Sequence, residues 1–486
     1  MRGWGHDKTR QILTSEERER LKELERENRE LRGGRVWAVS FRTKRRRREV
    51  ERPAGSHSGP TPHWTRRAFA SIAPRPDEQL GRWLKPGIWF WAAALAGLAI
   101  RAYLVLFTEG TYDVGILAEN AEGVRRDGLV GYYWANPAMN LPPFIAVLMS
   151  WVWSLAEATE VPFRVLLRAP FALLDAATAA LLLGALRANR YRFVLTACYW
   201  LHPLALIFSA YHGNTDSSVA FFLVSCVYLL SIKKTTGAAV ALGISLWIKL
   251  PGLLAIPALL FFLPSWLARL QFITVACGVS LVTYLPLLPN HADVLYRNVI
   301  GYRGQLIQTA AGIPVWGMRA LLPYPAQLAE GGHEWLAGVV LFYLKENYWL
   351  TLASILLLVW LRRSRRTIQD MGETIAGSYC VLYGLSIYWS FQYFAWSIPF
   401  WFLARKSFAV PATILASGYI YGLYWFLCGN PWLLGEWDFM GHPFWPHTIR
   451  LLRNGALLFF FLSAWLFLAG ALYEKVVMLY QRTRGG

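Results

Sequence analysis

Long apolar runs, repeated along most of the chain, constrain its fold more than any other feature of the sequence. Twelve such runs follow residue 87, at 88–107, 142–158, 169–186, 193–210, 217–232, 237–263, 270–288, 347–361, 372–389, 393–404, 408–427 and 455–475. A helix needs about 20 apolar residues to cross a bilayer. Because these runs are continuous rather than alternating, they predict an all-α, polytopic transmembrane bundle with about 11–13 spans.

The composition agrees with a membrane bundle. Hydrophobic types make up 55% of the residues and charged types 16%, whereas soluble domains contain about 25% charged residues. Aromatic residues reach 15%, with 24 Trp, which is typical of a chain that crosses many membrane–water interfaces. These values exclude a soluble one-domain enzyme and a fully disordered chain.

The charged residues separate a polar head, residues 1–86, from the bundle, residues 87–486. The head holds 22 Lys and Arg against 12 Asp and Glu. Residues 13–32 predict a short exposed helix with i,i+4 charge pairs, and residues 42–52 form a dense basic run. We expect a basic cytoplasmic head, disordered or in short helices, or upstream sequence wrongly included in the reading frame. The alternative is that the basic run binds nucleic acid or anionic lipid. We do not expect nucleic acid to be a partner of this protein.

Short basic clusters orient the predicted bundle. They lie at 231–234, 362–366, 405–406 and 481–484, and such clusters favour the cytoplasmic face of a cell membrane. The long loops expected at 108–141, 289–346 and 428–454 then share the extracytoplasmic face. If the runs at 142–158 and 169–186 each cross the membrane once, the basic segment at 187–192 falls on the extracytoplasmic face. This placement conflicts with the orientation that the other clusters favour. Large loops on one face favour a site at the membrane surface, whereas simple transporters have short loops and repeats.

Asp113 directly follows the first apolar run, among aromatic residues. A carboxylate at the bilayer edge can serve as a general base, and we expect partial burial to raise its pKa. The alternative is a helix-capping or solvated residue. The next stretch is amphipathic. It predicts a membrane-facing set, Ile116, Leu117 and Val124, and a water-facing set, Glu119, Glu122, Arg125 and Arg126.

A second polar motif lies between two apolar runs. His212, Asn214 and Asp216 fall within a few residues of one another and can supply a donor, an acceptor and a charge. The alternative is a polar turn between helices, in which Thr215 or Asp216 caps the next span. Both interpretations are compatible.

Two ionisable residues, Asp175 and Lys249, fall inside apolar runs, where charges are costly and usually face a cavity or a partner. Because Pro251 should break the helix after Lys249, this lysine is a candidate for phosphate contact. A third cluster contains Gln392, Tyr393 and Trp396. Aromatic faces with one amide suit a sugar ring, and an interfacial aromatic belt is the alternative.

Taken in order, these motifs resemble those of GT-C-type integral-membrane glycosyltransferases that use a polyprenyl-phosphate sugar. The similarity is greatest to the glycosylphosphatidylinositol mannosyltransferase I type and its bacterial relatives. It covers about residues 88–430, and the head has no counterpart. Four stretches carry it: Thr111-Tyr-Asp-Val114, His212-Gly-Asn-Thr-Asp-Ser217, Trp247-Ile-Lys-Leu-Pro251 and Phe391-Gln-Tyr-Phe-Ala-Trp396. Asp175 lies where that family has an intramembrane Asp, and we expect a structural role for it.

The resemblance implies transfer of a hexose, mannose by the closest likeness, from a polyprenyl-phosphate donor to a glycan, lipid or protein acceptor with inversion. Asp113 would be the catalytic base, and Lys249 or Arg303 would meet the donor phosphate. The other binding residues implied are His212, Asn214, Asp216, Gln392, Tyr393 and Trp396.

Two departures from the family pattern bear on this expectation. Gly115 replaces the second Asp of the family's first-loop motif, and His212 replaces an Arg. The first change argues against a paired-carboxylate metal site, so no metal or other cofactor is expected; a divalent metal stays open only through Glu119 or Glu122.

Two other functions compete with glycosyl transfer. A multi-span transporter or lipid flippase would explain the bundle and its intramembrane charges, but not the order of the motifs. A noncatalytic membrane scaffold would be tethered to nucleic acid through the basic head. The five Cys show no CxxC spacing, so we expect free thiols.

Overall fold

The structure is a computed structural model that describes residues 86–301, 317–364, 367–404, 406–438 and 445–484. Across these ranges the regular secondary structure is entirely helical, so the predicted all-α class is confirmed for them. The predicted head falls outside the described residues except for Pro86. Nothing in the structure therefore tests the expectations for that segment.

Five helices of the described chain are long and apolar enough to cross a membrane. They are α3 (Ile88–Phe107), α6 (Phe163–Ala185), α15 (Glu334–Arg362), α18 (Lys406–Cys428) and α19 (His447–Arg484). A sixth span forms if α7 (Arg192–Trp200) and the segment Pro203–Tyr211, bent by 49°, are counted together. That segment consists of α8 (Pro203–Leu206) and the π-helical turn η2 (Ile207–Tyr211).

The remaining apolar runs form shorter helices. These are α5 (Pro143–Thr159), α9 (Asp216–Ser231), α10 (Thr235–Ile248), η3 (Leu250–Ala255) with α11 (Ile256–Phe262), and α12 (Trp266–Leu281). The predicted run at 372–389 overlaps α16 (Ile368–Leu385), while the run at 393–404 is divided between η6 (Phe391–Trp396) and α17 (Ile398–Trp401). Length and composition thus define a membrane protein, with five or six candidate spans in the described residues rather than the 11–13 expected.

All three predicted loops contain helical residues, the third only the end of α18 and the start of α19. The first loop is mostly α4 (Tyr112–Ala135), and the second contains α13 (Leu288–Leu295), η4 (Tyr296–Ile300), η5 (Met318–Ala320), α14 (Pro325–Glu330) and the start of α15. The prediction that Leu117 and Val124 lie on the membrane is wrong, because both pack in the protein core at 6% and 5% exposure. Ile116 is exposed at 39%. The amphipathic pattern of α4 therefore reflects packing against the bundle.

The helix break predicted at Lys249 is confirmed. Helix α10 ends at Ile248, and Lys249 adopts an extended conformation with φ −160° and ψ 144° before η3 begins. Pro251 explains the break, because a proline removes one helical hydrogen bond and its ring clashes with the preceding turn. The result places a lysine side chain at the junction of two half-helices.

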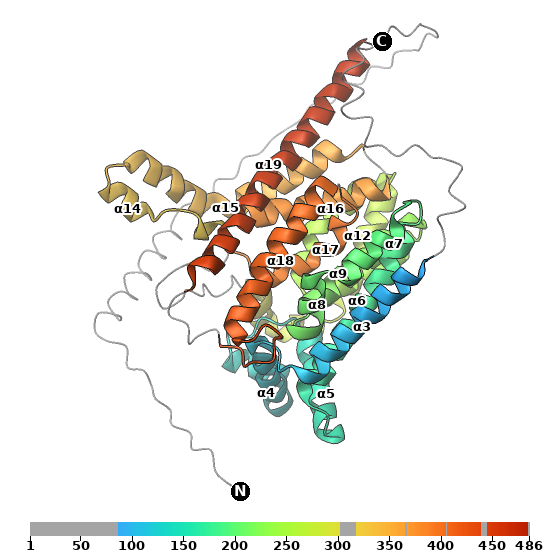
Figure 1. The fold of residues 1–486 in the computed structure, drawn as a ribbon, viewed down its shortest axis with the longest axis vertical. Coiled ribbons are helices and arrows are strands. Elements are labelled where there is room, and N and C mark those ends of the chain that lie inside the picture. Colours follow the sequence, from blue (N-terminus) through green and yellow to red (C-terminus); the bar gives the residue numbers. More distant parts are fainter. Residues whose placement is uncertain (1–85, 302–316, 365–366, 405, 439–444, 485–486) are drawn as a thin grey trace. The chain divides into compact units, whose positions relative to one another are not determined.

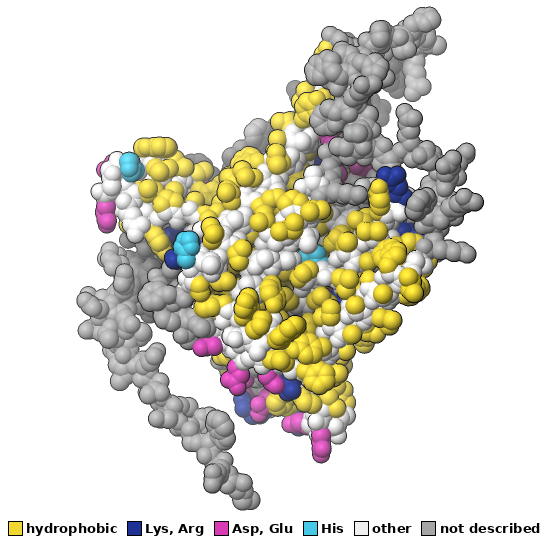
Figure 2. All heavy atoms as spheres, in the orientation of Figure 1, with side chains coloured by type: hydrophobic (Ala, Val, Ile, Leu, Met, Phe, Trp, Pro, Cys, Tyr) yellow, Lys and Arg dark blue, Asp and Glu magenta, His cyan; other side chains and the backbone are white. Residues whose placement is uncertain are grey.

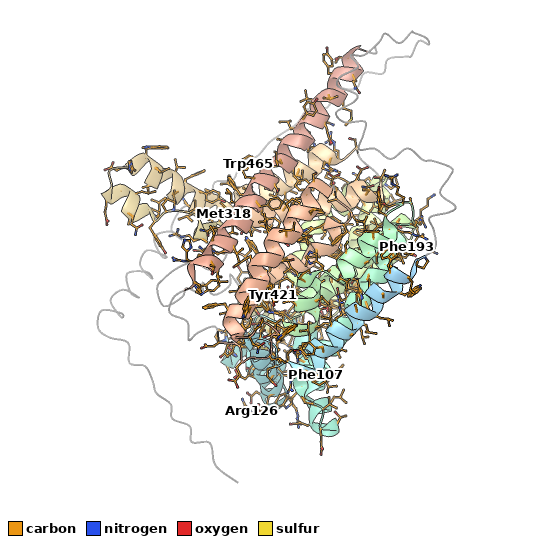
Figure 3. All side chains as sticks on the ribbon, viewed as in Figure 1. Phe107, Arg126, Phe193, Met318, Tyr421 and Trp465 are labelled. Carbon is orange, nitrogen blue, oxygen red and sulfur yellow. The ribbon has the colours of Figure 1, made fainter. Side chains whose placement is uncertain are left out.

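Helices α3, α6 and α9 pack in sequence, and α18 packs against α19 (Figure 1). Helices α4 and α5 pack together at one end of these long helices. Apolar side chains cover much of the long helices, whereas Asp and Glu gather near α4 and α5 (Figure 2). Figure 3 shows Phe107 and Arg126 at that end. Phe193, on α7, lies at the other end of α3, and its ring centroid is 5.1 Å from that of Phe90.

Candidate active site

A cluster of polar side chains surrounds Asp113 in the first turn of α4. Its Oδ2 atom lies 3.0 Å from His212 Nε2 and 3.0 Å from Asn214 Nδ2. The Asp113 side chain keeps 35% exposure, whereas that of His212 keeps 2%. Asp113 is therefore held from the protein side and open on the other, as an attacking or proton-accepting group requires.

Two glycines with positive φ lie where the turn that carries His212 and Asn214 meets the turn before α4. Gly213 has φ +75°, and a Cβ there would lie 2.6 Å from Val114 Cγ2. Gly110 has φ +87°, and a Cβ there would lie 2.9 Å from the Tyr211 carbonyl oxygen. Only glycine adopts these angles at low cost, and at Gly110 it also lets two backbone segments approach closely. The two turns consequently bring α4 and the segment before α9 into direct contact.

Asp216 and Lys249 form a second part of the same cluster. Lys249 Nζ lies 2.8 and 2.9 Å from the two carboxylate oxygens of Asp216 and 3.3 Å from Asn214 Oδ1. Trp396 Nε1 donates to Asp216 Oδ1 at 2.6 Å. The Asp216 side chain is 1% exposed and that of Lys249 is 22% exposed. Asn214 thus joins Asp113 to the Lys249–Asp216 pair.

The capping alternative for this turn is not what the structure contains. Thr215 occupies the N-cap position of α9 without a side-chain cap hydrogen bond, and Asp216 lies in the first turn. The Asp216 carboxylate is instead bound by Lys249 and Trp396. The local sequence was compatible with a cap, but tertiary contacts with charged and indole donors prevail.

The aromatic segment η6 lies beside this pair. The Tyr393 ring stacks on Trp396 with centroids 4.0 Å apart, and Lys249 Nζ is 5.7 Å from the Tyr393 centroid. Gln392 is half-buried, and its Oε1 accepts from Ser390 Oγ. The predicted motif residues are thus neighbours in space, but Trp396 is buried at 1% and contacts Asp216, which leaves Tyr393 as the more accessible ring.

The expectation that burial would raise the pKa of Asp113 is wrong. Burial by itself does raise this pKa, but the hydrogen bond and charge of His212, the Asn214 amide and the charge of Lys249 outweigh it. The pKa of the carboxyl therefore lies below its ordinary value of 3.8. Asp113 is ionised at neutral pH and can accept a proton without first losing one.

Two residues of this region were not singled out from the sequence. Arg168, on α6, is fully buried and donates to the carbonyl oxygens of Val105 at 3.0 Å and Tyr211 at 3.3 Å, and to the Thr108 hydroxyl at 2.9 Å. It therefore binds the end of α3 to the segment before His212. Tyr424, on α18, forms a short hydrogen bond with His212 Nδ1. The one sequence signal for Arg168 is its place at the edge of the apolar run at 169–186, two residues before Pro170. No feature of the sequence marks Tyr424.

Asp175 lies in a separate buried cluster within the bundle. Its carboxylate accepts from Arg101 Nε at 3.1 Å, from the Tyr199 hydroxyl and from Ser209 Oγ at 3.4 Å. The Arg101 guanidinium in turn lies 3.5 Å from the Trp200 ring centroid. This charge has its partners inside the protein, as a structural role would require.

Glu119 and Glu122, the predicted alternatives for a metal site, do not join the cluster. Arg303 lies outside the described residues. Glu119 and Glu122 are exposed on α4, without a described contact to Asp113. Among the described residues no group of three His, Cys, Asp or Glu is arranged to hold a metal ion, and the five Cys, all described, are free thiols.

The fold and the site together define an all-α membrane protein with a network of charged and polar side chains at one end of its helices. No protein-family model matches the chain, and neither a curated protein nor a solved structure is detectably similar to it.

Proposed function

We propose that the chain is an integral-membrane glycosyltransferase that moves a hexose, mannose by the family resemblance, from a polyprenyl-phosphate donor to an acceptor hydroxyl. One observation carries the proposal. A continuous path of hydrogen bonds joins Asp113, Asn214, Lys249, Asp216 and Trp396. These residues come from the four stretches that carry the resemblance, although up to 283 positions separate them. A chance likeness of four motifs gives no reason for all four to meet.

Asp113 is the proposed general base. Its Oδ2 accepts two hydrogen bonds, and its Oδ1 accepts none from the described residues. In the reaction, the acceptor hydroxyl gives its proton to Oδ1 as the acceptor oxygen bonds to the anomeric carbon. The bond from that carbon to the phosphate oxygen breaks, and its electron pair leaves with the polyprenyl phosphate. A single displacement of this kind inverts the anomeric centre.

The leaving phosphate needs positive charge, and Lys249 is the lysine of the described cluster that can supply it. Its charge is already shared with Asp216, so a phosphate must either share Lys249 or meet a second cation. Arg303 is the candidate for that second cation on sequence grounds. Such fixed charges stabilise a transition state because they need little rearrangement as the reaction proceeds.

The sugar would lie against the aromatic segment. The Tyr393 ring is half-buried and stacked on the buried Trp396, which keeps its plane fixed. Gln392 supplies an amide for sugar hydroxyls. The proposal includes a GT-C-like fold with the site on the extracytoplasmic face of the cell membrane, in agreement with the basic clusters at 231–234 and 362–366.

The test is release of radiolabelled sugar from polyprenyl-phosphate mannose, compared with the glucose and arabinose donors, using membranes that contain the protein. We expect transfer with the natural sequence and its loss in Asp113→Asn at unchanged expression. Asp127→Asn is the matched control, since Asp127 lies on the same helix, is exposed and contacts Arg126. Near-normal transfer by Asp113→Asn would remove this carboxylate as the base. Donor movement across the bilayer without sugar release would favour the transporter or flippase alternative.

A further inference from the structure

The imidazole of His212 is held at both of its nitrogen atoms. Nε2 lies 3.0 Å from Asp113 Oδ2, and Nδ1 forms a short hydrogen bond with the Tyr424 hydroxyl. The rings of Phe208 and Phe391 meet it edge-on, with centroids 6.1 Å away in each case. A side chain at 2% exposure with these neighbours has one orientation available.

The partners of the two nitrogens specify the tautomer. An ionised carboxylate only accepts hydrogen bonds, so Nε2 must carry the proton that is donated to Asp113. The Tyr424 hydroxyl has no other described hydrogen-bond partner, and it can donate to Nδ1 when that atom carries none. The contacts therefore run from the Tyr424 hydroxyl through the His212 ring to the Asp113 carboxylate.

This arrangement makes the two oxygens of Asp113 unequal. Oδ2 accepts from both His212 and Asn214, whereas Oδ1 accepts from no described residue. Hydrogen bonds to an oxygen stabilise its negative charge and lower its basicity. Oδ1 is consequently the oxygen that remains available to an incoming hydroxyl.

We propose that His212 and Tyr424 are positioning residues for Asp113, which hold its Oδ2 through the Nε2–H tautomer so that Oδ1 faces the acceptor. The proposal rests on the proposed function, in which Asp113 is the base. Neither residue needs to contact substrate. A phenol on α18 thereby acts on a carboxylate on α4 through the segment between η2 and α9.

The first experiment compares Tyr424→Phe with Tyr419→Phe in the transfer assay. Tyr419 lies on the same helix, and its buried hydroxyl has no hydrogen-bond partner among the described residues, so its loss breaks no described hydrogen bond. We expect kcat of Tyr424→Phe to fall about tenfold, the worth of one hydrogen bond, with KM little changed because the phenol positions the base and does not contact the substrate. Tyr419→Phe should keep the natural kcat and KM. A rise in KM with kcat unchanged, or no loss of activity in Tyr424→Phe, would overturn the proposal.

Conservative replacement and thermal unfolding supply two further readouts. His212→Gln keeps an amide donor for Asp113 and should retain more activity than His212→Leu; equal loss would count against positioning. The midpoint shifts of Tyr424→Phe and Asp113→Asn should be non-additive, since both act through His212, whereas Tyr419→Phe should add to Asp113→Asn. Additive shifts for Tyr424→Phe would refute the pair even if no sugar transfer is found, and absence of transfer by the natural protein counts against the proposed function alone.

Discussion

Replacing Lys249 by Met should destabilise the protein strongly, because it leaves Asp216 buried without its cation. The Asp216 side chain is 1% exposed, and Lys249 Nζ lies 2.8 and 2.9 Å from its oxygens. Removing one partner of a buried ion pair typically costs about 3–5 kcal/mol. Since the Trp396 indole still donates to Asp216, we expect about 3 kcal/mol for Lys249→Met.

The reverse change should cost less. Lys249 is 22% exposed, so in Asp216→Asn its ammonium can turn toward water, and we expect about 1–2 kcal/mol from the lost hydrogen bonds. The double variant should be close to Asp216→Asn and well short of the sum. The two substitutions are thus predicted to differ in their cost in unfolding free energy, and their effects are predicted to be non-additive.

Thermal unfolding in detergent, followed by tryptophan fluorescence, measures all three variants. Lys345→Met is the matched control, because Lys345 is 61% exposed and lies 3.8 Å from Glu346; a surface pair of this kind contributes little. A midpoint for Lys249→Met equal to that of Asp216→Asn, or additive effects in the double variant, would refute the reasoning.

Three further outcomes are expected. Gly213→Ala should cost about 2–4 kcal/mol, from its positive φ and the contact of the new Cβ with Val114. Gly429 also has a positive φ, but no described atom lies within 4 Å of an added Cβ. Thermal unfolding of Gly429→Ala should therefore show only the cost of the backbone conformation. Arg168→Met should cost about 3 kcal/mol or more, because it leaves several buried oxygens without their donor; limited proteolysis after α3 should become faster, and unchanged proteolysis would contradict its role. Because the pKa of Asp113 is lowered from 3.8 in the folded protein, its contribution to stability is present above pH 3.8 and lost as the pH falls through the folded value. The midpoint difference between the natural protein and Asp113→Asn should therefore be constant above pH 3.8 and shrink below it, and a difference that grows on acidification would contradict the sign.

Features that depend on neighbouring residues could be predicted well. The all-α class follows from continuous apolar runs, and the break beside Lys249 follows from Pro251. The number of spans could not be predicted as well, because hydropathy marks an apolar run but not how far a helix continues. The 20 residues of α3 and the 7 residues of α11 both come from apolar stretches.

The candidate site divides in the same way. Asp113, Asp216 and Lys249 stand out in the sequence because charges and carboxylates beside apolar runs are costly and rare. Their partners depend on how the helices pack: Lys249 pairs with Asp216 and not with solvent, and the pKa of Asp113 is lowered because donors surround it.

Local chemistry along the chain was therefore sufficient to identify the helical class, one helix break and most of the polar residues that cluster. Packing alone assigned their contacts, since Tyr424 is one of 23 Tyr and nothing near it in the chain distinguishes it. The physical reason is range: apolar periodicity and proline act within a few residues, whereas a hydrogen bond between positions 212 apart exists only after the helices have packed.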